Sequence, residues 1–351
     1  MRRVLFNLHL YLALTAGVFV AILGVTGAIM AFETELDHVL HARLSYVKPQ
    51  GRAMSLAEIG AAVGKQFPGE RIGGYSIATD PALSYGVSLR RGLVAVNQYT
   101  GEVLGVRPGG PDFLARVHQL HLRLLILGSR ADPGKTVMSW AGVVILFLAL
   151  SGLYLWWPYQ RVRISKGAKG FRYWFDLHNS VGILSLVFLV ILAFTGVMIG
   201  FEEHTVPMFY KLSRSAPSPR PGQAPPPPAG AKAISPDEAI EIARHAIPGT
   251  APFQVNVPGP RGYYQIRSRF PEDLTPGGRS FVVVDQYSGA VVFAEGSRTA
   301  PAGARMVIQN RAIHTGDIFG IPSKTLASLV CLALVMQLVS GLWMWGLRKT
   351  R

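Results

Sequence analysis

The sequence predicts an α-helical membrane protein with four transmembrane helices in two repeated halves and two α+β domains outside the membrane. Three observations lead to this fold class. The 351-residue chain is 49% hydrophobic, four stretches of about 20 residues contain no charged side chain, and several motifs occur twice at similar offsets. A helix of about 20 residues, rising about 1.5 Å per residue, spans the roughly 30 Å hydrocarbon core of a bilayer.

The apolar stretches define the predicted membrane helices and the domain boundaries. The first stretch follows Met-Arg-Arg, but it exceeds the about 7–15 apolar residues of a signal peptide and lacks a small-residue cleavage site. We therefore expect a retained helix. The four stretches are 8–31, 136–157, 180–201 and 325–346. The predicted segments are membrane helix 1 at 1–32, an outer domain at 33–115, an outer interfacial helix with membrane helix 2 at 116–157, a cytoplasmic loop at 158–175, membrane helix 3 at 176–202, a Pro/Ala-rich linker at 203–233, a second outer domain at 234–304, and an outer segment with membrane helix 4 at 305–351.

Charge distribution predicts the orientation of these helices. The N-terminal Met-Arg-Arg, the loop 158–175 and the C-terminal Arg-Lys-Thr-Arg hold 10 Lys or Arg and no acid. Because Lys and Arg beside short loops remain in the cytoplasm, both termini and this loop are predicted to be cytoplasmic. The net charge of +15 is then largely a topology signal and does not indicate nucleic-acid binding. The single cysteine, Cys331, excludes an intrachain disulfide and a Cys-x-x-Cys-His haem attachment motif.

Matched motifs predict that the chain arose by duplication. His9 and His178 lie 169 residues apart, and the same offset relates Thr26 to Thr195. "VNQYTGEV" at 96–103 also matches "VDQYSGAV" at 284–291, and "SGLYLWW" at 151–157 matches "SGLWMWG" at 340–346. The predicted unit is therefore helix, outer domain, helix.

The outer segments have the pattern of small α+β domains. Helical patterns at 55–67 and 235–247 each begin with a capping Ser, and the second also has Glu at the capping-box position. Runs of β-branched and aromatic residues follow each helix and predict antiparallel strands. The predicted strands lie at 85–91, 93–98, 263–270 and 280–286.

The order of these motifs resembles the PepSY-associated transmembrane family. The resemblance rests on Leu-His, Thr-Gly and Phe-Glu in the first helix, "VNQYTGEV" in the outer domain, and a second Leu-His before "SGLYLWW". It implies periplasmic PepSY-like domains in a multi-pass protein of the bacterial inner membrane. Members similar to this chain are iron-regulated proteins, including ferric-siderophore reductases with b-type haem, so the resemblance implies an oxidoreductase of the ferric-chelate reductase type.

One pair of histidines lies at the predicted cytoplasmic face. His9 and His178 stand at matched positions on membrane helices 1 and 3. A single histidine at a membrane boundary is readily explained as an interfacial polar side chain. Two histidines at matched positions would face each other across a two-fold axis, as the axial ligands of a haem in a helix bundle do. We therefore predict a haem b whose iron is bound by His9 and His178.

A second pair lies at the predicted outer face. His121 and His314 each precede a membrane helix, and the same argument predicts a second haem b bound through its iron by both rings. His118 lies one helical turn before His121 on the same face, so it is a rival ligand.

Acidic residues near the outer face suggest one further site. Glu33 and Glu202 match at the outer ends of membrane helices 1 and 3, and His204 lies beside the second. Such a group is able to bind a transition metal or relay protons. The alternative is that these are helix-end residues in contact with water. A tentative metal site of Glu33, Glu202 and His204 therefore remains a prediction, and the sequence identifies no catalytic residue.

Two haems at opposite faces of one bilayer predict transmembrane electron transfer. The cytoplasmic loop has fewer than 20 residues and no Rossmann glycine fingerprint follows a strand, so we expect a separate donor: a reduced flavin, a flavoprotein or a quinol. The resemblance points to a ferric siderophore as periplasmic acceptor.

Two alternatives stay open. The first is a haem-free envelope protein whose PepSY-like domains bind peptides or inhibit a protease. The second is a di-haem cytochrome b similar to quinol or superoxide oxidases, which shares the haems and differs in the direction of electron flow.

Overall fold

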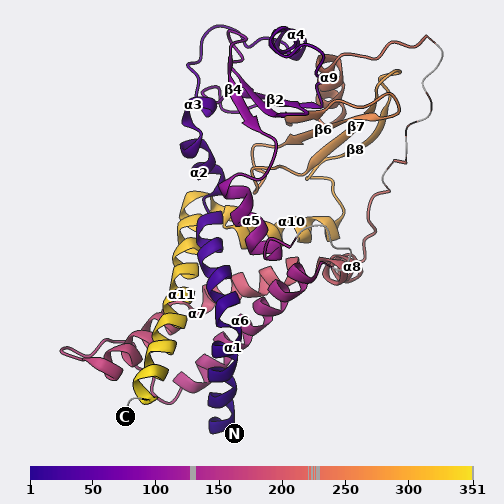
Figure 1. The fold of residues 1–351 in the computed structure, drawn as a ribbon. Helices are drawn as coiled ribbons and strands as arrows, with labels where there is room; N and C mark the ends of the chain where they lie inside the picture. The colour runs from indigo at the N-terminus through magenta and orange to yellow at the C-terminus, as the bar shows by residue number, and fades with distance from the viewer. Residues whose placement is uncertain (127–131, 220, 223, 225, 227–229, 350–351) are drawn as a thin grey trace. The chain divides into compact units, whose positions relative to one another are not determined.

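The computed structural model of the chain describes every residue except 127–131, 220, 223, 225, 227–229 and 350–351. The chain forms a helical unit and a sheet unit (Figure 1). The helical unit comprises Met1–Glu33, Pro111–Leu212 and Met306–Arg351, and the sheet unit comprises Thr34–Gly110 and Ser213–Arg305.

Long apolar helices build the helical unit. Among the described residues, four helices are long and apolar enough to cross a membrane, which confirms the prediction of a multi-pass membrane protein. They are α1 (Arg2–Met30), α6 (Pro133–Trp156), α7 (Gly170–Gly200) and α11 (Ile321–Lys349). Helices α1 and α7 each pack against both α6 and α11. Val20, Ile145, Leu189 and Leu334 meet in the buried centre of this bundle.

Shorter helices lie at the end of the bundle opposite the chain termini (Figure 1). They are α5 (Phe113–Arg123), α8 (Glu202–Leu212), α10 (Ala302–Thr315) and the 3₁₀ helix η1 (Asp317–Phe319). Helix α5 begins where the Asp112 side chain accepts a hydrogen bond from the backbone N–H of Ala115. Helix α8 occupies the start of the predicted linker 203–233, since two glutamates in its first turn and Lys211 in its last turn suit the helix dipole. Several later linker residues lie outside the described ones.

The sheet unit contains one antiparallel sheet. Its strands are β1 (Gly74–Ser76), β2 (Tyr85–Leu89), β3 (Gly92–Val96), β4 (Val103–Pro108), β5 (Ala251–Asn256), β6 (Tyr263–Arg269), β7 (Ser280–Asp285) and β8 (Val291–Glu295). In the described part of the chain these eight strands run in the order β4-β3-β2-β1-β5-β6-β7-β8. The sequence predicted two separate domains, whereas the pairing of Tyr75 with Val255 joins β1 to β5 and makes the sheet continuous.

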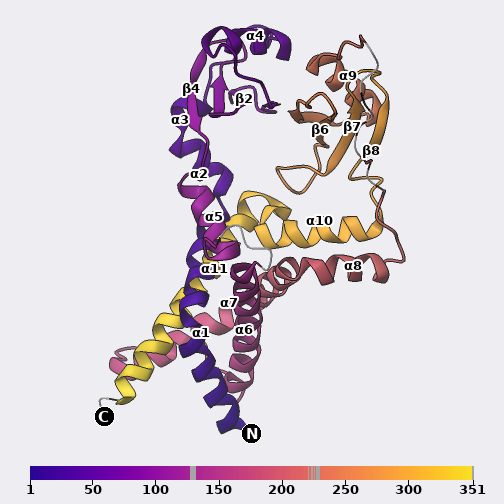
Figure 2. The same cartoon turned by 45° about the vertical axis from the view of Figure 1, so that its right-hand side comes forward.

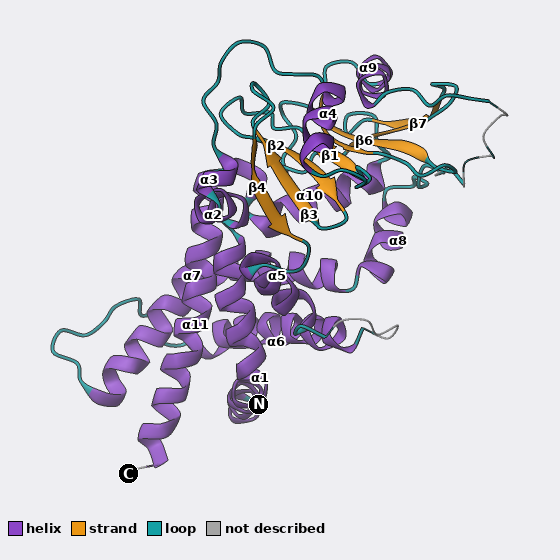
Figure 3. Cartoon of the chain, turned by 45° about the horizontal axis from the view of Figure 1, so that its top comes forward, coloured by secondary structure: helices purple, strands orange, loops and turns teal. Residues whose placement is uncertain are grey.

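Two helices cover the same face of this sheet, α4 (Leu56–Gln66) and α9 (Pro236–Ala246) (Figure 3). They share one apolar core with the strands, in which Ile59, Val63 and Val282 are buried. Both predicted serine caps are present, and each forms a full capping box with a glutamate three residues later. Two short helices, α2 (Glu33–Leu40) and α3 (Ala42–Ser45), precede α4.

Asp237, in the first turn of α9, also caps α4. Its carboxylate accepts hydrogen bonds from the backbone N–H groups of Leu56 at 2.8 Å and Ala57 at 2.9 Å. Asp237→Ala should therefore lower the free energy of opening of α4 by about 1–2 kcal/mol, the usual cost of a lost helix cap. Hydrogen–deuterium exchange of the α4 amides in the full-length protein measures this energy. Glu241→Ala is the control, because Glu241 forms an ion pair with exposed Arg244 on its own helix. Equal changes in both variants would contradict the prediction.

Candidate cofactor sites

The helical unit encloses a cavity at each end of the bundle. The start of α1 and the end of α11 lie at one end, and α5 lies at the other (Figure 1 and Figure 2). A first cavity of about 740 Å³, with His9 and His178 in its wall, lies at the end that carries the chain termini. A second cavity of about 290 Å³, with His121 and His314 in its wall, lies at the opposite end. The structure therefore brings together both predicted pairs.

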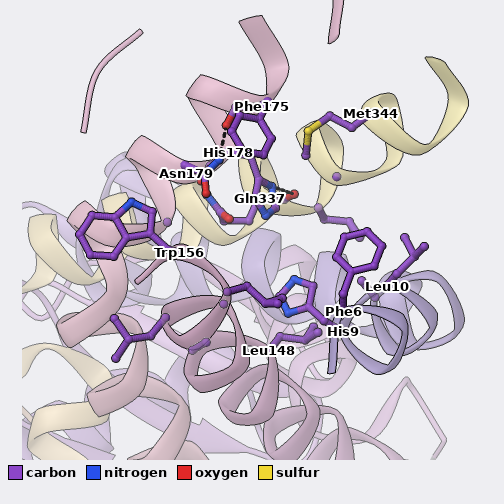
Figure 4. A pocket seen from close by; sticks show the side chains of 18 of the residues that line it. Phe6, His9, Leu10, Leu148, Trp156, Phe175, His178, Asn179, Gln337 and Met344 are labelled. Atoms are coloured by element: carbon purple, nitrogen blue, oxygen red, sulfur yellow. Dashed lines mark hydrogen bonds between the residues drawn. The ribbon is translucent and has the colours of Figure 1, made fainter. Parts of the chain in front are cut away.

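The first cavity is apolar between its two histidines. His9 comes from α1 and His178 from α7, and Figure 4 shows the two rings on facing walls. Among the described residues that line it are the side chains of three arginines and of no acidic residue. Arg2 lies 5.1 Å from the ring centre of Tyr159, and Arg348 lies 5.4 Å from that of Phe6. Among the described lining residues, no acidic side chain balances the positive charge that lies beside these aromatic rings.

Hydroxyl groups hold the rings of the first pair. Nδ1 of His9 lies 2.8 Å from Oγ of Ser151 on α6. Nδ1 of His178 lies 2.9 Å from Oγ of Ser340 on α11 and 3.1 Å from the backbone carbonyl oxygen of Gln337. With Nδ1 occupied in both rings, Nε2 is the nitrogen that remains to bind a ligand.

Hydroxyl groups hold the second pair in the same way. Nδ1 of His121 on α5 lies 2.7 Å from Oγ1 of Thr26 on α1. Nδ1 of His314 on α10 lies 3.3 Å from Oγ1 of Thr195 on α7 and 3.1 Å from the carbonyl oxygen of Leu192. Helices α5 and α10 lie outside the membrane-spanning segments, and burial lowers the pKa of His121 to about 3 and also that of His314. Both rings are therefore neutral at pH 7, as metal ligation requires.

The spacing of the second pair fits a single metal atom between the rings. Their centroids lie 6.4 Å apart and the rings are tilted by 53°. Metal–imidazole bonds of about 2.0–2.1 Å place two ligand nitrogens about 4 Å apart, and adding the ring radius on each side gives about 6 Å between centroids. The distance between His121 and His314 agrees with this value.

A glycine follows each hydroxyl residue and lies against the histidine ring that this hydroxyl contacts. The four motifs are Thr26-Gly27, Ser151-Gly152, Thr195-Gly196 and Ser340-Gly341. A Cβ atom on Gly196 would lie 2.7 Å from Cε1 of His314, closer than packed atoms tolerate. On Gly152 it would lie 3.6 Å from Cε1 of His9, an ordinary contact. Each Ser/Thr-Gly pair therefore binds Nδ1 of one ring and accommodates that ring.

Sequence reasoning did not assign a role to these four hydroxyl groups. The Ser/Thr-Gly pairs matched the two halves of the chain, and their fourfold occurrence beside apolar stretches was the available signal. Their partners are distant in sequence: His9 and Ser151 are 142 residues apart. Only the packing of α1 against α6 brings these two side chains together.

The remaining candidates near the second cavity have other partners. Nδ1 of His118 lies 3.1 Å from Oε1 of Glu33, and both side chains are 38% exposed. The carboxylate of Glu202 pairs with Nζ of Lys135 at 2.8 Å. His204 is exposed and does not belong to the described lining of the cavity. Glu33 and Glu202 both line the second cavity, where each is paired with a basic partner, whereas His204 stands outside that lining. Nδ1 of His118 is thus taken up by Glu33, as Nδ1 of His121 is by Thr26.

The residues of both cavities fit a haem. Each cavity offers two imidazoles whose Nδ1 atoms are already hydrogen-bonded, apolar walls for a porphyrin, and basic side chains at its edge. Bis-histidine ligation between facing helices is a common way to hold b-type haem. The first cavity, of about 740 Å³, lies well within the range of about 300–1,000 Å³ usual for ligand sites, and the second, of about 290 Å³, falls just below that range.

A family model described as "PepSY-associated TM region" matches residues 6–348, and no curated protein matches the chain. The matched range includes the four histidines of the two pairs, all of α6 and α7, and most of α1 and α11.

Proposed function

Because this chain belongs to the family of PepSY-associated transmembrane proteins, we propose that it transfers electrons across a bacterial inner membrane through two b-type haems. The observation that carries the proposal is the pair of facing histidines at each end of one helix bundle. A haem iron held by two histidines would supply one-electron transfer. His9 and His178 would hold one haem, and His121 and His314 the other.

Basic side chains would hold the carboxylates of each haem. Arg2, Arg3 and Arg348 line the first cavity, and Arg123 and Arg311 line the second. A guanidinium group binds a carboxylate through two charge-assisted hydrogen bonds. In the first cavity the arginines also set the local charge, because no acidic side chain belongs to its described lining.

Charge also supports a direction for electron flow. With both termini in the cytoplasm, as their Lys and Arg residues favour, the first cavity faces the cytoplasm and the sheet unit is periplasmic. The positive mouth of the first cavity would attract an anionic donor such as a reduced flavin nucleotide or an acidic flavoprotein. The proposed acceptor is a ferric siderophore on the periplasmic side, whose Fe(III) takes one electron to become Fe(II).

A visible spectrum tests the proposal. We expect the detergent-purified protein, expressed with ample haem, to show a low-spin b-type spectrum that changes on dithionite reduction. A pyridine extract should contain two haems b per chain, because the two histidine pairs are separate. A colourless protein would contradict the proposal, and the sheet unit would then be the place to search for function.

A further inference from the structure

The hydrogen bonds around the four ligand histidines differ within each pair. We propose that Ser151 and Thr26 are the residues that position His9 and His121, while backbone carbonyls provide a second anchor for His178 and His314. This inference rests on the proposed haem sites. It assigns a role to the hydroxyl groups and predicts that one ligand of each haem depends on a single replaceable side chain.

The direction of each hydrogen bond follows from the hydroxyl proton. Every hydroxyl also contacts a backbone carbonyl of its own helix: Thr26 contacts Ile22, and Ser151 lies 3.2 Å from the carbonyl oxygen of Leu148. A carbonyl only accepts, so the hydroxyl donates its one proton there and its oxygen accepts from the imidazole. Nδ1 therefore carries the ring proton, and Nε2 keeps the lone pair that binds iron.

The same argument holds for the other half of the chain. Oγ of Ser340 lies 2.7 Å from the carbonyl oxygen of Met336, and Oγ1 of Thr195 lies 2.7 Å from that of Ile191. All four hydroxyl groups thus favour the histidine tautomer with its proton on Nδ1.

Backbone carbonyls distinguish the two members of each pair. Nδ1 of His178 lies 3.1 Å from the Gln337 carbonyl oxygen, and Nδ1 of His314 lies 3.1 Å from that of Leu192. Within the described residues, no carbonyl lies within hydrogen-bonding distance of Nδ1 of His9 or His121. A side-chain substitution does not remove a carbonyl, so His178 and His314 retain an acceptor when their hydroxyl is lost.

Loss of the hydroxyl should therefore have unequal effects. In Ser151→Ala or Thr26→Val the partly buried ring N–H loses its acceptor. This loss is costly and permits rotation of the ring or the other tautomer. The partner of the second ring nitrogen usually contributes about 10- to 100-fold to metal affinity. It also raises the basicity of the ligand and so favours ferric iron, and its loss should raise the reduction potential of that haem.

The experiment compares four matched variants of the full-length haem protein: Ser151→Ala, Ser340→Ala, Thr26→Val and Thr195→Val. Haem loss to apomyoglobin and the midpoint potential of each haem are measured. Ser151→Ala and Thr26→Val should each lose their haem at least about tenfold faster. If the affinity for haem falls tenfold in the ferric state only, the midpoint potential of that haem rises by about 59 mV. Ser340→Ala and Thr195→Val should change both quantities much less.

Conservative variants separate positioning from packing. Ser151→Thr and Thr26→Ser keep the hydroxyl and should restore the potential of the parent protein. The positioning role would be overturned if the two hydroxyl variants of one site changed haem loss and potential equally. It would also be overturned if variants that retain two haems showed no change, and in both cases the proposed function would stand. A parent protein without haem would overturn both.

Discussion

Replacing His178 with alanine should remove the haem of the first cavity and leave the other, so that haem b falls from two to about one per chain. The half-buried ring extends from α7, with its Nδ1 hydrogen-bonded to Ser340 and Gln337 of α11, and within the described residues His9 is the other histidine of that cavity. His9→Ala should have the same effect. A pyridine extract gives the stoichiometry, and the reduced spectrum of either variant identifies the haem of the second cavity.

His118 provides the matched control for this experiment at the second cavity. It lies one turn from His121 on α5, but its Nδ1 contacts the Glu33 carboxylate and its side chain is 38% exposed. His118→Ala should therefore retain two haems, whereas His121→Ala should retain one. The reverse result would make His118 the ligand, and haem retention in all the histidine variants would contradict bis-histidine binding at either cavity.

The elements predicted from sequence are those specified by local patterns. Uninterrupted apolar runs define the membrane helices, and the Ser55 and Ser235 caps define where α4 and α9 begin. The junction of the sheet depends instead on a non-local contact. Strand β1 is only Gly74–Ser76, too short for an alternating pattern, and its pairing with β5 joins segments about 180 residues apart.

The candidate sites also combine features that local sequence patterns specify with features that depend on non-local packing. Matched sequence positions predicted the pairs His9 with His178 and His121 with His314, and each pair lines one cavity. Whether a nearby hydroxyl or a backbone carbonyl meets Nδ1 depends on the rotation of each helix about its axis. That rotation is determined by packing in the bundle, so the different anchoring of His9 and His178 is visible only in three dimensions.

The four glycines of the Ser/Thr-Gly motifs are equivalent in sequence but not in space. A Cβ atom on Gly196 would meet Cε1 of His314 at 2.7 Å and Nδ1 at 3.3 Å. On Gly341 it would lie 3.7 Å from Cε1 of His178. The first contact involves a ring that is already held by Thr195 and the Leu192 carbonyl, so it is not relieved by a small side-chain movement.

Gly196→Ala should therefore impair the second haem site, whereas Gly341→Ala should leave the first intact. Overpacking of this kind costs about 1–3 kcal/mol, which corresponds to about 5- to 150-fold in affinity for the second haem. Haem content and the rate of haem transfer to apomyoglobin measure the loss. If Gly196→Ala and Gly341→Ala have the same effect, the close approach of His314 to Gly196 does not limit haem binding at the second site. A loss in Gly196→Ala alone would show that the second site needs the space left by the absent Cβ at position 196. It would not be a general effect of replacing a glycine in these motifs.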